Sequence, residues 1–231
     1  MKISILTLFP HMFEGFLNES IIKRAIEKKQ VEIEIINFRD YSTLNNNQVD
    51  DTPYGGGAGM VLMCQPIFDC IEDIKTNDSL VIMMTPDGIT YNQKLAKNLT
   101  QKKHLIILCG HYEGFDERIK SIVDMEVSIG DFILTGGEIP AMAITDSITR
   151  LLDGVINEDS LASESFEDDL LDYPVYTKPA NFRGLLVPEV LLSGNHQKID
   201  EWRKNARIEK TKLKRSDIMG ENYESSIYKE E

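Results

Sequence analysis

The sequence has few of the residues that mark disulfide-linked, secreted or membrane proteins. Its 231 residues include three cysteines, which form no Cys-x-x-Cys pair and leave an odd thiol. This excludes a disulfide framework and a cysteine metal site, and it is typical of a reducing cytosol, so we expect a cytoplasmic protein. No window reaches the roughly 18 apolar residues of a membrane span, and no cleavage site follows the short apolar N-terminus.

The sequence also lacks an overall excess of positive charge. The net charge of −13 excludes a uniformly basic coat for nucleic acid, but the charge is unevenly distributed. Residues 153–172 contain eight acidic and no basic side chains, whereas residues 176–215 contain ten Lys or Arg against four Asp or Glu. This pattern predicts a solvated acidic linker followed by a basic surface that faces a polyanion. An ordinary solvated helix with i,i+4 ion pairs is the alternative for the basic part.

The segment "DDTPYGGGAGMVLM", residues 50–63, is rich in glycine but matches neither common phosphate-binding loop. A Walker loop ends in Gly-Lys-Ser/Thr, and here Met-Val-Leu follows Gly59. A dinucleotide fingerprint that starts at Gly55 requires glycine at its sixth position, which is Met60. Two readings remain: a surface hairpin or Ω-loop, and a loop whose backbone closely approaches a ligand.

Strand-like and helix-like segments alternate along the first two-thirds of the chain. The predicted strands are 2–9, 31–38, 79–86, 104–110 and the start of 126–138, and the predicted helices are 12–29, 66–74, 91–101, 116–124 and 139–152. The central strands are apolar throughout, which indicates a parallel sheet with helices on both faces. Residues 39–60 are predicted as a long loop, and residues 196–218 as a basic amphipathic helix with Ile199, Trp202, Ala206 and Leu213 facing inward.

Three polar turns follow the apolar strands: "TPDG" (85–88), "CGHYEGFDE" (109–117) and "LTGGE" (134–138). Ligands of open α/β sheets bind beyond the carboxyl ends of the strands, so these turns could converge on one pocket. The glycines of the third turn either expose backbone groups to a ligand or serve the turn geometry alone. His111 has no Ser or Cys nucleophile paired with it, which argues against a hydrolase triad. Residues 116–118 read as a helix start with an ion pair, and Arg150 as a cation at a helix C-terminus.

Taken together, several long motifs resemble one family. "SILTLFPHMF", "VDDTPYGGGAGMVL", "LCGHYEGFDERI", "SIGDFILTGGEIPAM", "LLDYPVYTKP" and "VPEVLLSGNH" occur in the order and spacing of the bacterial tRNA (guanine-N1)-methyltransferases, from Lys2 to about Asp217. The resemblance implies an α/β SPOUT fold: a parallel sheet with a deep C-terminal trefoil knot, plus a small helical C-terminal domain. It further implies a knotted S-adenosylmethionine-binding catalytic domain (1–156), an acidic flexible linker (157–172) and a basic helical tRNA-binding domain (173–231).

The resemblance assigns S-adenosylmethionine binding to the three turns, with the adenine held largely by backbone groups. The positions implied are Thr85, Pro86, Gly110, Tyr112, Glu113, Gly114, Ile129, Gly130, Asp131, Phe132, Ile133, Leu134, Gly136, Gly137 and Pro140. Asp50 and Gly59 are implied to lie beside the target base. Some family members require a divalent ion. The sequence has no dedicated metal-binding site, so any Mg²⁺ is expected to be coordinated mainly by substrate oxygens.

The implied reaction is methylation of N1 of guanosine 37 in tRNA, by an obligate homodimer whose active sites use both chains. N1 carries a proton, so a base must remove it and a cation must stabilise charge on O6. Arg150 matches the family's O6-binding arginine. The family's base is an aspartate, and the matching position in this sequence is Glu164, within "ASESF". The linker is about one residue shorter than in the family, so Asp168 and Asp169 are the alternatives for the base. The competing hypotheses are a nucleotide-dependent α/β enzyme and a non-catalytic RNA-binding module.

Overall fold

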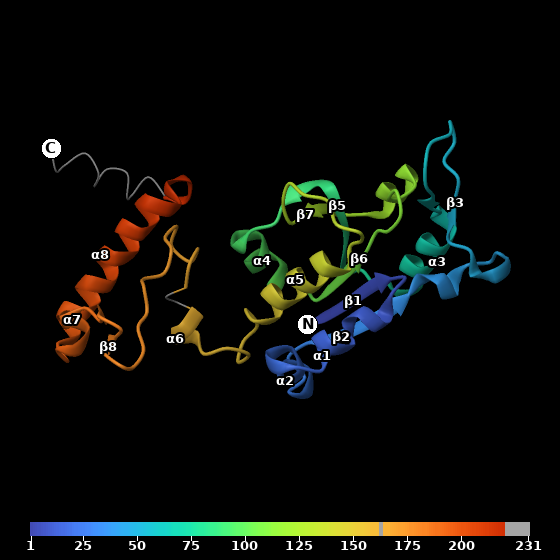
Figure 1. Ribbon diagram of the computed structural model, residues 1–231. Coiled ribbons are helices and arrows are strands. Elements are labelled where there is room, and N and C mark those ends of the chain that lie inside the picture. Colours follow the sequence, from blue (N-terminus) through green and yellow to red (C-terminus); the bar gives the residue numbers. More distant parts are fainter. Residues whose placement is uncertain (162–163, 220–231) are drawn as a thin grey trace. The chain divides into compact units, whose positions relative to one another are not determined.

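The computed structural model describes residues 1–161 and 164–219 and divides the chain into two compact units, Met1–Ile156 and Asn157–Glu231 (Figure 1). Residues 162–163 of the predicted linker and 220–231 of the predicted C-terminal domain lie outside the described residues. Each unit is therefore considered by itself.

The first unit is built on a five-stranded sheet. Its strands are β1 (Lys2–Thr7), β2 (Glu32–Asn37), β5 (Ser79–Thr90), β6 (His104–Leu108) and β7 (Met125–Ser128), in the order β2-β1-β6-β5-β7. All four pairings are parallel. This confirms the predicted α/β class, and it follows from strands whose side chains are buried on both faces.

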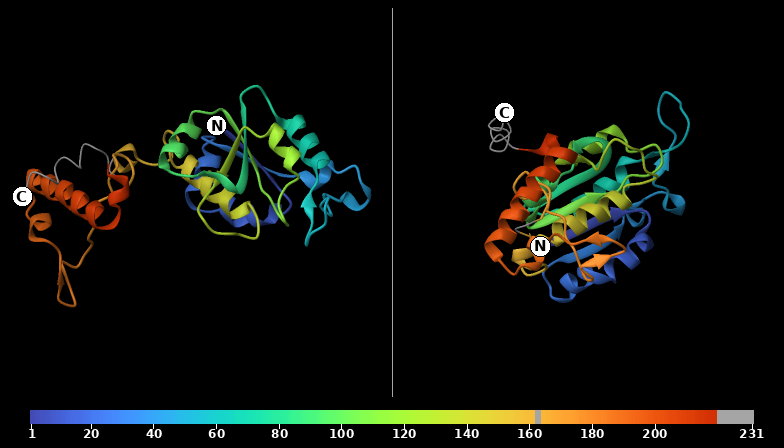
Figure 2. Two further views of the ribbon diagram at one scale, coloured as in Figure 1. Left: turned by 90° about the horizontal axis from the view of Figure 1, so that it is seen from above. Right: turned by 60° about the vertical axis from the view of Figure 1, so that its left-hand side comes forward.

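Alternate residues of the strands supply two separate hydrophobic cores. Leu105 and Ile107 of β6 pack into the core beneath α2 (Ser20–Glu27), α4 (Gln93–Thr100) and α5 (Glu138–Thr149). Ile106 and Leu108 pack into the opposite core, beneath α3 (Cys64–Ile74) and the 3-10 helix η4 (Glu117–Ile122). The helices therefore cover both faces of the sheet, with α3 and α5 on opposite sides of it (Figure 2).

Two predicted helices differ from the structure. Residues 12–29 do not form one helix but a 3-10 turn (η1, Pro10–Phe13), a short α1 (Glu14–Leu17) and α2. The break comes where the Asn18 side chain donates to the Glu14 carbonyl at 2.8 Å, ending α1, and Glu19 adopts an extended conformation. The segment predicted as a helix at 116–124 contains the 3-10 helix η4, which spans only Glu117–Ile122, with Asp116 as its N-cap. The predicted start is therefore correct, but the helix type is wrong.

The predicted long loop at 39–60 is more structured than expected. It contains the 3-10 turns η2 (Phe38–Tyr41) and η3 (Asn45–Asn47), and its end forms an antiparallel hairpin between β3 (Asp50–Asp51) and β4 (Val61–Leu62). The glycine-rich segment is the connection of this hairpin.

Strand β5 is longer than predicted because it resumes its parallel pairing with β7 after a bulge at residues 85–88. Val127 pairs with Met84 and again with Ile89, and the register shifts between these two positions. Glycine is required at position 88, because a Cβ there would lie 2.3 Å from the Val127 nitrogen. The predicted first turn, at 85–88, therefore packs closely against β7.

The second unit is small and mainly helical. Its elements are α6 (Glu158–Leu161), β8 (Asn181–Phe182), β9 (Leu185–Leu186), α7 (Glu189–Leu192), α8 (His196–Lys214) and η5 (Ser216–Ile218). The acidic segment before β8 packs on α8: Leu171 N donates to Thr211 Oγ1 at 2.9 Å, and Asp168 pairs with Arg207. The inward position predicted for Leu213 is wrong, since its side chain is 83% exposed, and Thr211 is buried instead.

Among the helices of the described residues, none combines the length and the apolar character needed to cross a bilayer. The three cysteines are free thiols, and two of them, Cys70 and Cys109, are buried in the first unit. Burial raises the pKa of Cys70 to about 12 and also raises that of Cys109, so both remain protonated core residues.

Candidate functional site

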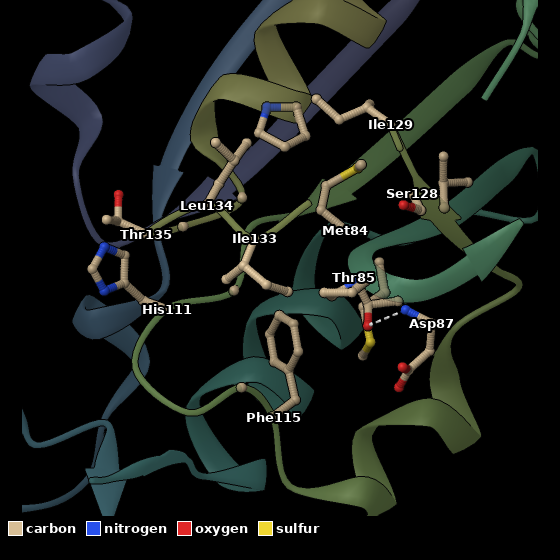
Figure 3. Close-up of a pocket in the computed structure, with 18 of the residues that line it drawn as sticks. Met84, Thr85, Asp87, His111, Phe115, Ser128, Ile129, Ile133, Leu134 and Thr135 are labelled. Carbon is tan, nitrogen blue, oxygen red and sulfur yellow. Dashed lines mark hydrogen bonds between the residues drawn. The ribbon is translucent and has the colours of Figure 1, made fainter. Parts of the chain in front are cut away.

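The carboxyl ends of β5, β6 and β7 surround a cavity of about 550 Å³ (Figure 3). Its walls are the predicted first turn, which the structure places in a bulge within β5, and the turns that follow β6 and β7. Phe115 of the second turn points toward Ile133 of the third, and Thr85 and Asp87 line the side formed by the first turn. Residues of all three predicted turns therefore line one cavity, as expected.

Almost all residues predicted to bind the cofactor line this cavity. They are Thr85, Pro86, Gly110, Tyr112, Glu113, Gly114, Ile129, Gly130, Phe132, Ile133, Leu134, Gly136, Gly137 and Pro140. Asp131 is the exception: it is exposed and is not among the lining residues. Asp50 and Gly59 do not line the cavity either, although their hairpin is attached to its wall.

The second and third turns touch through their backbones. Gly137 N donates to Gly110 O at 2.9 Å, and a Cβ on Gly137 would lie 2.7 Å from the Cys109 Cα. A Cβ on Gly136 would lie 2.4 Å from Glu138 Oε2 and 2.7 Å from the His111 ring. Glycine is therefore needed at both positions for packing, which supports the geometric reading of this turn.

A buried carboxylate holds the third turn in place. Glu138 is only 2% exposed, lies in the first turn of α5, and accepts a hydrogen bond from Thr7 Oγ1 at 2.8 Å. Thr7 ends β1, so this contact joins the start of α5 to the carboxyl end of that strand. A negative charge is also favourable at a helix N-terminus. This contact could not be predicted from the sequence, because 131 residues separate its two partners.

The glycine-rich hairpin rests on the second turn. Glu113 N donates to Met60 O at 3.0 Å, and Leu62 N donates to Gly114 O at 2.9 Å. Gly59 has a φ of +82°, and a Cβ there would lie 2.4 Å from Glu113 Cγ. Within the protein, Gly59 therefore lies close to the side chain of Glu113, which lines the cavity.

Charged groups at the cavity are mainly acidic. Asp87, Glu113 and Glu117 line it, and Lys120 is the basic residue among its lining side chains. Lys120 Nζ lies 3.1 Å from Glu117 and 3.5 Å from Glu126, and these carboxylates raise its pKa. The excess of carboxylates suits a ligand that carries positive charge.

Several cavity residues were not predicted to bind. Asp87 and His111 lie next to glycine in the turns quoted above, so the sequence could have indicated that they line the cavity. Lys120 lies on η4, and nothing in the sequence pattern indicated that it lines the cavity. The neighbouring group at 116–118 is the predicted ion pair: Arg118 donates to both Asp116 oxygens, at 2.9 and 2.7 Å, and lowers the pKa of that carboxyl.

Neither of the two predicted catalytic residues is among the residues that line this cavity. Arg150 follows the last residue of α5, whose first turn lies at the cavity. At roughly 1.5 Å per residue, the helix carries Arg150 about 20 Å from Gly137. Glu164 belongs to the second unit, where its backbone N–H bonds to Leu161 O at 3.3 Å. The described part of the chain contains no cluster of three His, Cys, Asp or Glu side chains arranged to hold a metal.

Comparison with known proteins covers nearly the whole chain. The family profile described as "tRNA (Guanine-1)-methyltransferase TrmD" matches residues 1–221. A tRNA (guanine-N(1)-)-methyltransferase of Malacoplasma penetrans is 60% identical over 218 residues, covering 94% of this chain and 96% of the relative. Proteins of the same name from Carboxydothermus hydrogenoformans and Bacillus cereus are 58% and 53% identical, over 95% and 96% of this chain and 87% and 93% of their own.

Proposed function

Because the chain belongs to the tRNA (guanine-1)-methyltransferase TrmD family, we propose that it transfers a methyl group from S-adenosylmethionine to N1 of guanosine 37 in tRNA. The observation that carries this proposal is the meeting of the three strand-end turns around one cavity, inside the region that the family profile matches. The chain is an enzyme of the methyltransferase class; the nucleotide position and the donor are the proposed parts.

The cavity suits S-adenosylmethionine in size and charge. Its volume of about 550 Å³ lies within the range of small-molecule sites. Asp87, Glu113 and Glu117 suit a cationic ligand, and Phe115 and Leu134 offer apolar surface to a purine. When bound, the donor supplies a methyl group on a positively charged sulfur. The acidic lining and the backbone groups of the glycine turns would hold and orient it.

We further infer that this part of the chain forms the trefoil knot of the SPOUT fold. Two contacts support the inference. Strand β5 pairs with β7 in parallel on both sides of a bulge, through Met84 and again through Ile89, so the bulged residues 85–88 lie against β7. The chain after β7 then returns to β6, where Gly137 bonds to Gly110. A threaded third turn would enclose a ligand on several sides without needing many side chains.

Arg150 and Glu164 are proposed as the catalytic residues. The protonated N1 of guanine is a poor nucleophile, so a carboxylate that accepts its proton raises its reactivity. An arginine that donates to O6 stabilises the negative charge that develops there. Asp168 is a weaker candidate for the base, because both of its oxygens bond the guanidinium of Arg207.

The length of α5 supports a homodimer with shared sites. Arg150 and the cavity lie at opposite ends of this helix in one chain, and an arginine side chain cannot bridge about 20 Å. An Arg150 that acts on the target base must therefore reach the cavity of a second copy. Asp50 and Gly59, on the hairpin attached to Glu113 and Gly114, remain proposed neighbours of the target base.

Two measurements separate this function from its competitors. Calorimetric titration with S-adenosylmethionine, ATP and NAD should give binding of the first; binding of ATP or NAD alone would favour a nucleotide-dependent enzyme. Nucleoside analysis of tRNA after reaction should identify 1-methylguanosine. Binding of tRNA without any methylated product would favour a non-catalytic RNA-binding module instead.

A further inference from the structure

The tip of the glycine-rich hairpin presents one large aromatic side chain to solvent. Tyr54 is 101% exposed, the highest value among the exposed large hydrophobic residues that the structure describes. A tyrosine in this position gains nothing from burial within the chain. The residues after it, Gly55 and Gly56, have positive φ angles, and a Cβ on either would meet no atom within 4 Å.

The base of the hairpin, in contrast, is fixed to the cavity wall. β3 and β4 pair through Asp50 with Leu62 and Asp51 with Val61. Leu62 bonds on one side to Gly114 O and on the other to Asp116 N, each at 2.9 Å. The ring of Tyr54 is therefore carried on a short loop whose two ends are held beside the second turn of the cavity.

We propose that Tyr54 stacks on an unpaired base of the tRNA anticodon loop next to the guanine that is methylated. This proposal rests on the proposed function and names a binding residue for its RNA substrate. Aromatic side chains bind unpaired bases by stacking, because every base presents a π-face and the contact needs no hydrogen-bond code. An anticodon loop offers such bases beside the target.

The charge of the hairpin favours contact with a base over contact with the RNA backbone. Between Arg39 and Lys75 the sequence has no lysine or arginine, and Asp50 and Asp51 lie at the base of the hairpin. Phosphate groups are bound mainly by cations, so this segment is poorly suited to them. The aromatic ring of Tyr54 is therefore the group at the tip that can make a favourable contact with an RNA base.

The composition of the tip also argues against a second protein copy as its occupant. The residues that follow Tyr54 are Gly55, Gly56 and Gly57, which add no side-chain surface. Protein interfaces bury a core of several packed side chains. A single ring among glycines matches a single base better than it matches a protein surface.

The test compares Tyr54→Phe, which keeps the aromatic ring, with Tyr54→Leu, which keeps an apolar side chain but removes the ring. Leu44→Ala is the matched control, since Leu44 is an exposed apolar residue of the preceding segment, at 47% exposure. Each full-length protein is titrated with tRNA transcripts that carry 2-aminopurine beside the target guanine, whose fluorescence reports stacking. The KM for tRNA, kcat and the affinity for S-adenosylmethionine are measured in parallel.

We expect Tyr54→Leu to raise the KM for tRNA roughly 5- to 150-fold, the range of one stacked base, and to abolish the fluorescence change. Tyr54→Phe and Leu44→Ala should resemble the wild type, and cofactor affinity should not change. An unchanged KM and fluorescence response in Tyr54→Leu would overturn the proposal, as would a change of its oligomeric state in sedimentation. If the wild type gives the fluorescence change but transfers no methyl group, the proposed reaction fails and the stacking contact stands.

Discussion

At the scale of single residues, one carboxylate of the acidic segment is tied to helix α8 by an ion pair. Asp168 is engaged by Arg207, whose side chain is only 15% exposed and also donates to Leu171 O at 3.2 Å. That pair joins the acidic segment to α8 within the second unit. A carboxylate held in this way is poorly placed to accept a proton from a substrate, and for this reason Glu164 is the proposed base.

Exchanging each acid for its amide separates the two roles. Glu164→Gln should lower kcat by about 10²-fold or more, because it removes the proposed proton acceptor while keeping the shape of the side chain. Asp168→Asn should leave kcat close to the wild type and lower the free energy of unfolding by roughly 0.5–1 kcal/mol, as for a partly exposed ion pair. Single-turnover methyl transfer and urea denaturation measure the two effects. The opposite pattern would move the base to Asp168.

At the scale of elements, the central strands were the most predictable part of the fold. Ile106 and Ile107 are both buried, on opposite faces, and such apolar runs bounded by polar turns are typical of parallel strands. The bulge of β5 could not be predicted in this way, because it depends on the pairing of Val127 with residues about 40 positions earlier in the sequence. The helix at 12–29 is broken where Asn18 bonds the Glu14 carbonyl, Glu19 is extended and Ser20 has a positive φ, none of which apolar periodicity reports.

The candidate site was predictable where glycine marks a turn and unpredictable elsewhere. The quoted turns include most of the lining residues, since strand ends meet at one edge of a parallel sheet. Lys120 and Glu138 were missed because their roles arise from packing between distant segments. The assignment of Arg150 came from resemblance; its surroundings alone indicate a helix C-terminus.

The junction of the second and third turns gives a test of element packing. Gly137→Ala should destabilise the protein by about 1–3 kcal/mol and weaken S-adenosylmethionine binding, because the new methyl group would meet the backbone of Cys109. Gly15→Ala is the control: it adds the same methyl group in α1, where no atom lies within 4 Å, and should be neutral or slightly stabilising. Thermal unfolding and calorimetric titration would compare them. Equal stability of the two variants would contradict this packing.

The junction of β1, β5 and β6 gives a test by pH. His104 is 6% exposed, and its ring nitrogens lie 2.9 Å from Ser4 Oγ and 2.7 Å from Ser79 Oγ. Burial lowers its pKa, with Lys2 adding to this and Glu34 and Glu32 opposing it.

A lowered pKa means that the unfolded chain binds the proton more readily. The His104 contribution to the free energy of unfolding should therefore be fully present above about pH 6.5, the ordinary histidine value, and be lost as the pH falls toward the lower folded pKa. Urea denaturation between pH 5 and 8 should show a smaller pH dependence for His104→Gln than for the wild type. Identical slopes would remove His104 as the cause.

At the scale of the whole molecule, the proposed active site needs two chains. Arg150→Ala should lower kcat by about 10²- to 10³-fold, because it removes a donor to the charge that develops on O6, and should leave cofactor affinity unchanged. Leu134→Trp should fill the cavity and abolish cofactor binding. Mixed dimers of the two variants keep one intact cavity facing one intact Arg150.

Methyl transfer should therefore reappear when the two inactive proteins are mixed and allowed to exchange subunits. A mixture as inactive as its components, although sedimentation detects mixed dimers, would place Arg150 and the cavity in the same chain's site. This experiment tests the division of the site between copies without requiring a structure of the complex.

The central claim is that this chain methylates one ring nitrogen of one guanine in tRNA. Its most direct test is the transfer of labelled methyl from S-adenosylmethionine to two tRNA transcripts that differ only in carrying guanine or adenine at position 37. We predict that label is incorporated into the guanine transcript alone and is recovered as 1-methylguanosine. Equal labelling of both transcripts, or of neither, would contradict the claim.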